Sequence, residues 1–148
     1  MLRLASLTLA LFAVLAAAPA AFAQSEEDVM ASIENIHGDS EGFFELFGLL
    51  QDAMMFGDPT TIAANVTYPI TIAANGESYE VASEQDMLDN FDTLISTNAQ
   101  EAIRTQDVAD LIVTSEGVGF GDGQVWVSNI CADDSCTETH WGITAINN

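Results

Sequence analysis

Histidine and cysteine, the side chains best suited to zinc or covalent chemistry, number two each in this 148-residue chain. The two histidines, His37 and His140, lack the i, i+4 spacing with which a helix presents two imidazoles to zinc. Acidic turns at residues 121–123 and 133–135 offer oxygen ligands of the kind calcium takes, but the calcium-binding loop motif is absent and turn chemistry explains both. We therefore expect no metal and no cofactor, and the spacing singles out no catalytic residue.

The only two cysteines, Cys131 and Cys136, predict one disulfide if the chain is exported. Disulfide geometry fits directly opposed residues of an antiparallel pair, whose Cα atoms lie roughly 5.5 Å apart. Two strands, at residues 124–131 and 136–146, would then place Trp126 opposite Trp141 on one face. We expect the disulfide to fix this register, because a slip by one residue would turn both tryptophans to the other face.

The first 23 residues have the layout of a secretory signal peptide. Arg3 gives a positive start, an apolar run follows over residues 4–18, and Ala21-Phe22-Ala23 provides a cleavage signal. An uncleaved membrane anchor is the alternative, but the apolar run is short for a bilayer. We expect a mature protein in the periplasm or secreted, with no membrane association after signal cleavage.

Charge is the most unusual global property of the chain. After residue 23 there are 23 acidic residues and one base, Arg104, so the mature net charge is about −22. Such a chain should be repelled by nucleic acid and by anionic membranes. The acidity suits either a solvated surface in salty surroundings or a basic partner protein. Arg104 could pair with Glu101 or Asp107 on a helix surface, or it could contact an anion.

The N-terminal half of the mature chain reads as helical. Residues 24–39 are expected to form an acidic leader with a turn or two of helix, and residues 40–148 a single domain. A helix is predicted to start at Ser40 as its N-cap and to stop at Gly57. A short helix follows over residues 59–65, with Asp58 as its cap. The apolar side chains of the longer helix predict that it is largely buried: Phe43, Phe44, Leu46, Phe47, Leu49, Leu50 and Met54.

Period-two alternation begins near Tyr68. An Asn75-Gly76 turn between alternating runs predicts a hairpin in which Ile72 faces Tyr79 and Ile70 faces Val81. Helical spacing then resumes after a capping residue at Ser83 and again over residues 99–104. Residues 108–115 fit either a short buried strand or the end of a turn, and the two strands around the cysteines complete the chain.

This order of elements resembles uncharacterised exported bacterial members of the nuclear-transport-factor-2-like superfamily. Four strings carry the resemblance: FFELFGLLQDAMMFGD, VTYPITI, DMLDNFDTLIS and GVGFGDGQVWV. The resemblance covers roughly residues 43–127. It implies an α+β fold, a cystatin-like cone in which N-terminal helices pack on a curved antiparallel sheet. Members of the superfamily have a pocket at the open end of the cone, and the fold does not imply one function.

Five aromatic side chains are candidates to line such a pocket, or else belong to the core: Phe47, Tyr68, Phe91, Trp126 and Trp141. Because no catalytic motif carries over, we expect a non-enzymatic binding or interaction module for a small apolar ligand or a basic protein. One alternative is an isomerase or lyase with an Asp or Glu base, which would need a buried carboxylate near Tyr68 or Tyr79. The other is an acidic inhibitor or immunity-like protein for a basic partner.

Overall fold

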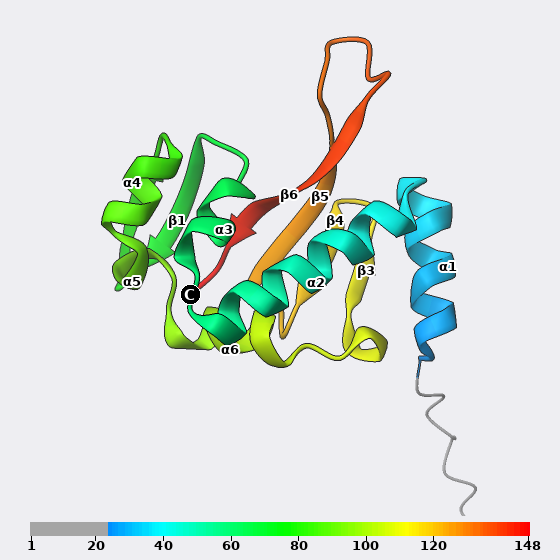
Figure 1. Ribbon diagram of the computed structural model, residues 1–148, viewed down its shortest axis with the longest axis horizontal. Helices are drawn as coiled ribbons and strands as arrows, with labels where there is room; N and C mark the ends of the chain where they lie inside the picture. The colour runs from blue at the N-terminus through cyan, green and yellow to red at the C-terminus, as the bar shows by residue number, and fades with distance from the viewer. Residues whose placement is uncertain (1–23) are drawn as a thin grey trace, which may run out of the picture.

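The computed structural model describes residues 24–148, so the predicted signal peptide lies outside the described residues. Helices and antiparallel strands combine in an α+β fold, as the sequence predicts (Figure 1). The helices are α1 (Glu26–His37), α2 (Ser40–Phe56), α3 (Pro59–Ala64), α4 (Glu84–Asp89), α5 (Phe91–Leu94) and α6 (Thr97–Thr105). The strands are β1 (Ile70–Ala74), β2 (Glu77–Val81), β3 (Ile112–Thr114), β4 (Gly117–Phe120), β5 (Val125–Cys131) and β6 (Thr139–Ile146). Within residues 24–148, no helix is both long and apolar enough to cross a membrane.

The strands form two sheets that lie side by side. Four strands make an antiparallel sheet in the order β3-β4-β5-β6, while β1 and β2 form a separate hairpin. Two isolated parallel bridges connect this region to β6: Val66, before β1, bridges to Ile143, and Ala73, near the end of β1, bridges to Asn147, directly after β6. α2 crosses one face of the four-stranded sheet (Figure 1). Part of the core therefore lies between α2 and this sheet, and the rest lies between the hairpin and the neighbouring helices.

α1 is a helix of 12 residues that packs on the core, so the prediction of only a turn or two of helix over residues 24–39 was wrong. Ser25 caps the helix, and its hydroxyl accepts from the Asp28 backbone while the Asp28 carboxylate bonds back to Ser25, a reciprocal capping box. Val29 and Ile33, one helical turn apart, are fully buried against the core. These two side chains attach α1 to the core, although most of the other residues of the helix are acidic or polar.

α2 has the predicted extent but a different cap. Asp39 is the N-cap, and its carboxylate accepts from the Gly42 N–H at 2.9 Å. Ser40 is the first helical residue, and its hydroxyl donates to Glu34 at 2.8 Å. The helix ends at Gly57, whose φ of 68° is the left-handed conformation that glycine adopts at little cost.

One side of α2 is uncovered, which contradicts the prediction of a largely buried helix. Phe43, Phe47 and Leu50 are buried towards the sheet, and Phe47 stacks on Phe120 of β4 with ring centroids 5.6 Å apart. Leu49 is 46 % exposed and Phe56 is 79 % exposed, although both extend the apolar pattern. Neighbouring elements cover only one side of α2, and Leu49 and Phe56 lie on the side that is left open to solvent.

The Asn75-Gly76 hairpin follows the predicted register, with Ile72 opposite Tyr79 and Ile70 opposite Val81. Asp58 caps α3 as predicted, since its carboxylate accepts from the backbone of Thr60 at 3.0 Å. The predicted helix after Ser83 is broken at Asn90 into α4 and α5. Residues 108–115 form a 3₁₀ turn at Val108–Asp110 followed by β3, so a strand is present, but its residues are exposed or half-buried instead of buried.

The predicted register of the last two strands was wrong. Cys131 pairs with Thr139, Asn129 with Trp141 and Trp126 with Ala145, so the tryptophans are not partners. Cys131 and Cys136 do form a disulfide, with Cα atoms 4.7 Å apart. Cys136, however, lies in the loop that joins the strands and has a positive φ of 53°. The disulfide closes this loop instead of joining directly opposed strand residues.

Beyond the sheet, residues 131–140 form a projecting loop that we call the arm (Figure 1). Every residue of the arm is exposed. The Ala132 N–H donates to the Glu138 carbonyl at 2.7 Å, which continues the strand register into the arm. The arm is thus a short hairpin extension, and its tip is tied by the disulfide.

Candidate functional site

The five aromatic pocket candidates occupy different places. Phe47 and Trp141 are buried and both contact Phe43, with centroid distances of 5.9 and 5.2 Å. The Trp141 indole N–H donates to the Asp39 carbonyl at 2.9 Å. Trp126 lies half-buried on the other face of the sheet, where its indole N–H donates to the Gly123 carbonyl at 3.1 Å. The structure therefore brings Phe47 and Trp141 into one cluster and separates Trp126 from them.

Tyr68 and Phe91 lie among the helices beside the hairpin. The Tyr68 hydroxyl donates to the Ala63 carbonyl at 2.9 Å, and burial, with smaller contributions from the carboxylates of Glu84 and Asp86, raises its pKa to about 12. Phe91 lines a hollow of about 240 Å³ between α2, α3, α5 and α6. Of the five candidates, Phe91 opens on this hollow and Trp141 on a second one beside the arm.

An acid–base site needs a carboxylate whose pKa is raised by burial. Among residues 24–148, no charged or polar residue is buried. Glu84 and Asp86, the carboxylates that act on Tyr68, are exposed, and the Tyr79 hydroxyl donates to the exposed Glu77 at 2.9 Å. The described tyrosines and acids therefore do not form the buried pair that the isomerase alternative requires.

The sequence predictions overlooked one string, residues 38–42, GDSEG, which matches the G-x-S-x-G pattern of hydrolase nucleophile elbows. That pattern needs a turn from a strand into a helix, whereas Ser40 begins α2 directly after α1. The Ser40 hydroxyl donates to Glu34, and His37 Nε2 lies 2.9 Å from the Thr114 carbonyl oxygen. Serine and histidine are engaged with other groups and do not form a nucleophile–base pair.

The other polar candidates also have structural partners. Arg104 forms an ion pair with Glu101 at 2.5 Å, with both side chains about half exposed. His140 is exposed at the base of the arm. No three His, Cys, Asp or Glu side chains within the described part of the chain gather closely enough to hold a metal ion.

A groove runs along the uncovered side of α2. Its first part, a hollow of about 470 Å³, lies between α2 and the base of the arm. Leu46 and Leu49 contribute apolar surface from α2, and Thr139, His140 and Trp141 line it from β6. The hydrogen bond from Trp141 to Asp39 joins the two walls at one end. The helix and the strand that form this hollow are therefore fixed relative to one another.

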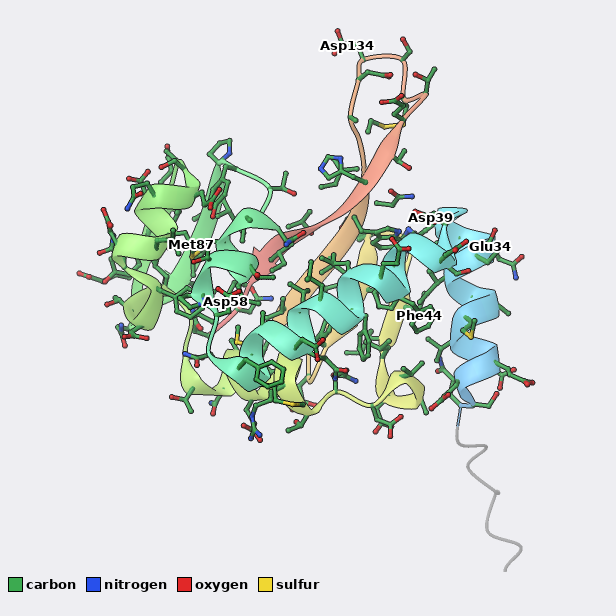
Figure 2. The ribbon with its side chains drawn as sticks, in the orientation of Figure 1. Glu34, Asp39, Phe44, Asp58, Met87 and Asp134 are labelled. Carbon is green, nitrogen blue, oxygen red and sulfur yellow. A yellow bond between two sulfur atoms is a disulfide. The ribbon has the colours of Figure 1, made fainter. Side chains whose placement is uncertain are left out.

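The groove continues towards α3 through Leu49. A second hollow, of about 170 Å³, lies between α2 and α3 and is lined by Leu49, Ala53 and Phe56 with Asp52, Asp58 and Thr61. Leu49 and Phe56 are seven residues apart, two helical turns, so they lie along one side of α2. Asp39 and Asp58 mark the two ends of this helix (Figure 2). We call this surface, from Asp39 to Asp58, the α2 groove.

Carboxylates surround the apolar floor of the α2 groove. Asp39 and Glu45 line the end near the arm, and Asp52 and Asp58 line the end near α3. The Thr61 hydroxyl and neighbouring backbone N–H groups lower the pKa of Asp58, so it stays ionised at neutral pH. The one ion pair found among residues 24–148 joins Arg104 to Glu101, so none of these four carboxylates has a cationic partner there. The groove combines apolar surface with carboxylates that have no cationic partner among the described residues.

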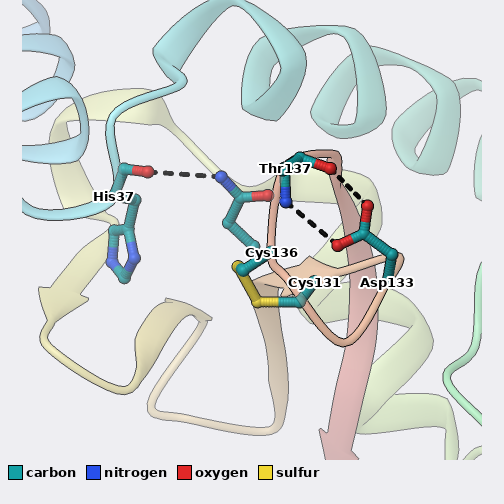
Figure 3. Close-up of a disulfide and its surroundings, with 6 residues drawn as sticks. His37, Cys131, Asp133, Cys136 and Thr137 are labelled. Carbon is teal, nitrogen blue, oxygen red and sulfur yellow. Dashed lines mark hydrogen bonds between the residues drawn. A yellow bond between two sulfur atoms is a disulfide. The ribbon is translucent and has the colours of Figure 1, made fainter.

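The arm, whose base lines one end of the groove, is internally braced (Figure 3). The Asp133 carboxylate accepts from the backbone and hydroxyl of Thr137, and these bonds lower the pKa of Asp133. At its base, the Asn129 side-chain amide donates to the His37 carbonyl at 3.2 Å. The disulfide and these contacts give the arm a defined shape without burying it.

Comparison with known proteins gives no identification: no family model, curated protein or solved structure matches this chain.

Proposed function

We propose that this protein is an exported, non-enzymatic interaction module that binds a partner protein through the α2 groove. The observation that carries the proposal is the exposure of Phe56, 79 % of its surface, in line with the half-exposed Leu49 beside a shaped hollow. Exposed apolar side chains that gather along a groove, within an acidic rim, are typical of interaction sites. The isomerase or lyase alternative lacks a buried carboxylate among the described residues.

Export is part of the proposal. Its supports are the signal-peptide pattern of residues 1–23 and the pairing of Cys131 with Cys136, because disulfides persist in oxidising compartments. N-terminal sequencing of protein recovered from the periplasm or medium tests it, with Gln24 as the expected first residue. Recovery of uncleaved protein from the cytoplasm with free thiols would contradict export.

Membership of the nuclear-transport-factor-2-like superfamily, with its cone-shaped sheet, is also proposed. It is supported by the order of elements and by the parallel bridges that place the β1–β2 hairpin next to β6. With these bridges, six strands follow one another across the two sheets, and α2 packs against one side. The interior on that side is filled by aromatic and aliphatic side chains, so a surface partner fits the domain better than an enclosed ligand.

A site-specific photo-cross-linker tests the proposed function in the cell that produces the protein. The cross-linker replaces Phe56, and a matched variant carries it at Thr93, an exposed residue of α5. We expect a covalent adduct with another protein from position 56 and none from position 93. If positions 49 and 56 give no adduct under conditions in which the protein accumulates normally, the α2 groove is not a protein-binding surface.

A further inference from the structure

We propose that the occupant of the α2 groove is a basic amphipathic α-helix of a partner protein. This proposal rests on the proposed function and adds the chemistry of the partner. It follows from three features of the groove: its apolar floor, its carboxylates without cationic partners among the described residues, and its course along one helix.

The floor defines the apolar face of the occupant. Leu49 and Phe56 are separated by two helical turns, and Leu46 and Ala53 lie between and beside them. An amphipathic helix presents apolar side chains at i, i+3, i+4 and i+7, which matches this spacing when it packs alongside α2. The 17 residues of α2 provide a track of about 25 Å, enough for several turns of a second helix.

The rim defines the charge of the occupant. Asp39 and Glu45 at one end, and Asp52 and Asp58 at the other, flank the apolar floor without cationic partners among residues 24–148. Lysine or arginine side chains on the polar face of the occupant would meet these carboxylates while its apolar face covers Leu49 and Phe56. The same charges oppose a second copy of this chain, a nucleic acid or an anionic membrane.

Binding of designed peptides to the purified mature protein tests the proposal. The first peptide is a helix as long as α2, with leucines on one face and lysines on the other. The second has glutamate in place of lysine, and the third has the residues of the first in an order that destroys the amphipathic pattern. Fluorescence anisotropy of each labelled peptide gives its dissociation constant at low and at moderate salt.

Two variants locate the binding. Leu49→Ser with Phe56→Ser removes exposed apolar surface, and Glu45→Gln with Asp52→Asn removes two rim charges. We expect the first pair to weaken binding of the leucine–lysine peptide about tenfold or more, and the second pair about threefold to tenfold. Glu27→Gln with Glu80→Gln removes the same charge from exposed residues outside the groove and should change binding less than about twofold. Thermal unfolding of each variant confirms that the fold is retained.

Each contrary outcome overturns the proposal in a defined way. Equal weakening by the rim and the control charge variants would indicate general attraction to an acidic surface. If the glutamate peptide binds as tightly as the leucine–lysine peptide, the occupant need not be basic. If the scrambled peptide binds as tightly, the occupant need not be an amphipathic helix. If a protein cross-links to position 56 but no peptide binds, the proposed function stands and the basic helix is wrong. A dimer in sedimentation that the Leu49→Ser, Phe56→Ser variant dissociates would assign the groove to a second copy.

Discussion

Trp126 and Trp141 point to opposite faces of the same sheet. Trp141 packs edge-on against Phe43 on the face that α2 covers, with ring centroids 5.2 Å apart. The Trp126 indole covers Gly119 and Gly123 on the other face. The two tryptophans are therefore independent reporters, one for the core beside the α2 groove and one for the outer surface of the sheet.

The first prediction concerns the disulfide. Because Cys136 lies outside the strand ladder, replacing Cys131 and Cys136 by serine should leave the pairing of Asn129 with Trp141 intact. The closed loop is short, so we expect a loss of about 2 kcal/mol or less in the free energy of unfolding. Amide exchange should accelerate in the arm. Trp141 emission, measured in a Trp126→Phe background, should not change, and a red shift would show that the disulfide does set the register.

Gly119 and Trp126 give a second prediction. A Cβ at position 119 would lie 3.1 Å from Trp126 Cζ2, closer than ordinary van der Waals contact. Gly119→Ala should therefore destabilise the protein by about 1 kcal/mol. In a Trp126→Ala background the same change should be neutral or stabilising, because the contact is gone and alanine restricts the unfolded chain. Urea unfolding of the four proteins measures this coupling, and an equal cost in both backgrounds would contradict it.

The third prediction concerns alkaline pH. Burial raises the pKa of Tyr68 to about 12, above its value in an unfolded chain, because the neutral phenol is favoured in the fold. Its contribution to stability is thus fully present below about pH 10 and is lost as the pH rises from 10 through 12. The hydrogen bond to Glu77 also raises the pKa of Tyr79, so the phenolate absorbance of each single variant is needed: the step near pH 12 should be missing in Tyr68→Phe and retained in Tyr79→Phe. Titration of Tyr68 near pH 10 would show that the phenol is open to solvent.

Ionic strength provides a fourth prediction. Twenty-three acidic residues and a single base follow residue 23, and Arg104 already pairs with Glu101. Salt should weaken the repulsion among these carboxylates, so the midpoint of thermal unfolding at neutral pH should rise by several degrees with added sodium chloride. Arg104→Gln should have little further effect, because exposed pairs contribute little. A midpoint independent of salt would show that the acidic surface is already well solvated.

The parts of the fold that local sequence could predict were those controlled by local backbone chemistry. Asn75-Gly76 determined the register of its hairpin, because both residues accept the positive φ of the turn. Asp58 and Gly57 mark the boundary between two helices for similarly local reasons. The final hairpin was different: Cys136 lies in the loop outside the strand ladder, so the cysteine pair does not specify the register of β5 and β6.

The α2 groove could not have been predicted from the sequence. Apolar residues surround much of α2, and a pattern of this kind is typical of a buried helix. Whether Leu49 and Phe56 are covered depends on α3 and the arm, which are set by tertiary packing. The burial of Val29 and Ile33 in α1 was not predicted for the opposite reason. Most of their neighbours in the sequence are acidic or polar, so the segment as a whole resembles an exposed one.

Arg104, the one lysine or arginine among residues 24–148, also determines where a trypsin-like protease can cut the domain. An enzyme that cuts after lysine or arginine finds one target in residues 24–148, Arg104, and that target lies in helix α6 with its guanidinium bonded to Glu101. Cleavage requires an extended backbone, so α6 must open before it can be cut. The long exposed arm contains no such target at all. In an environment rich in trypsin-like enzymes, the lifetime of the protein would be governed by the opening of one helix.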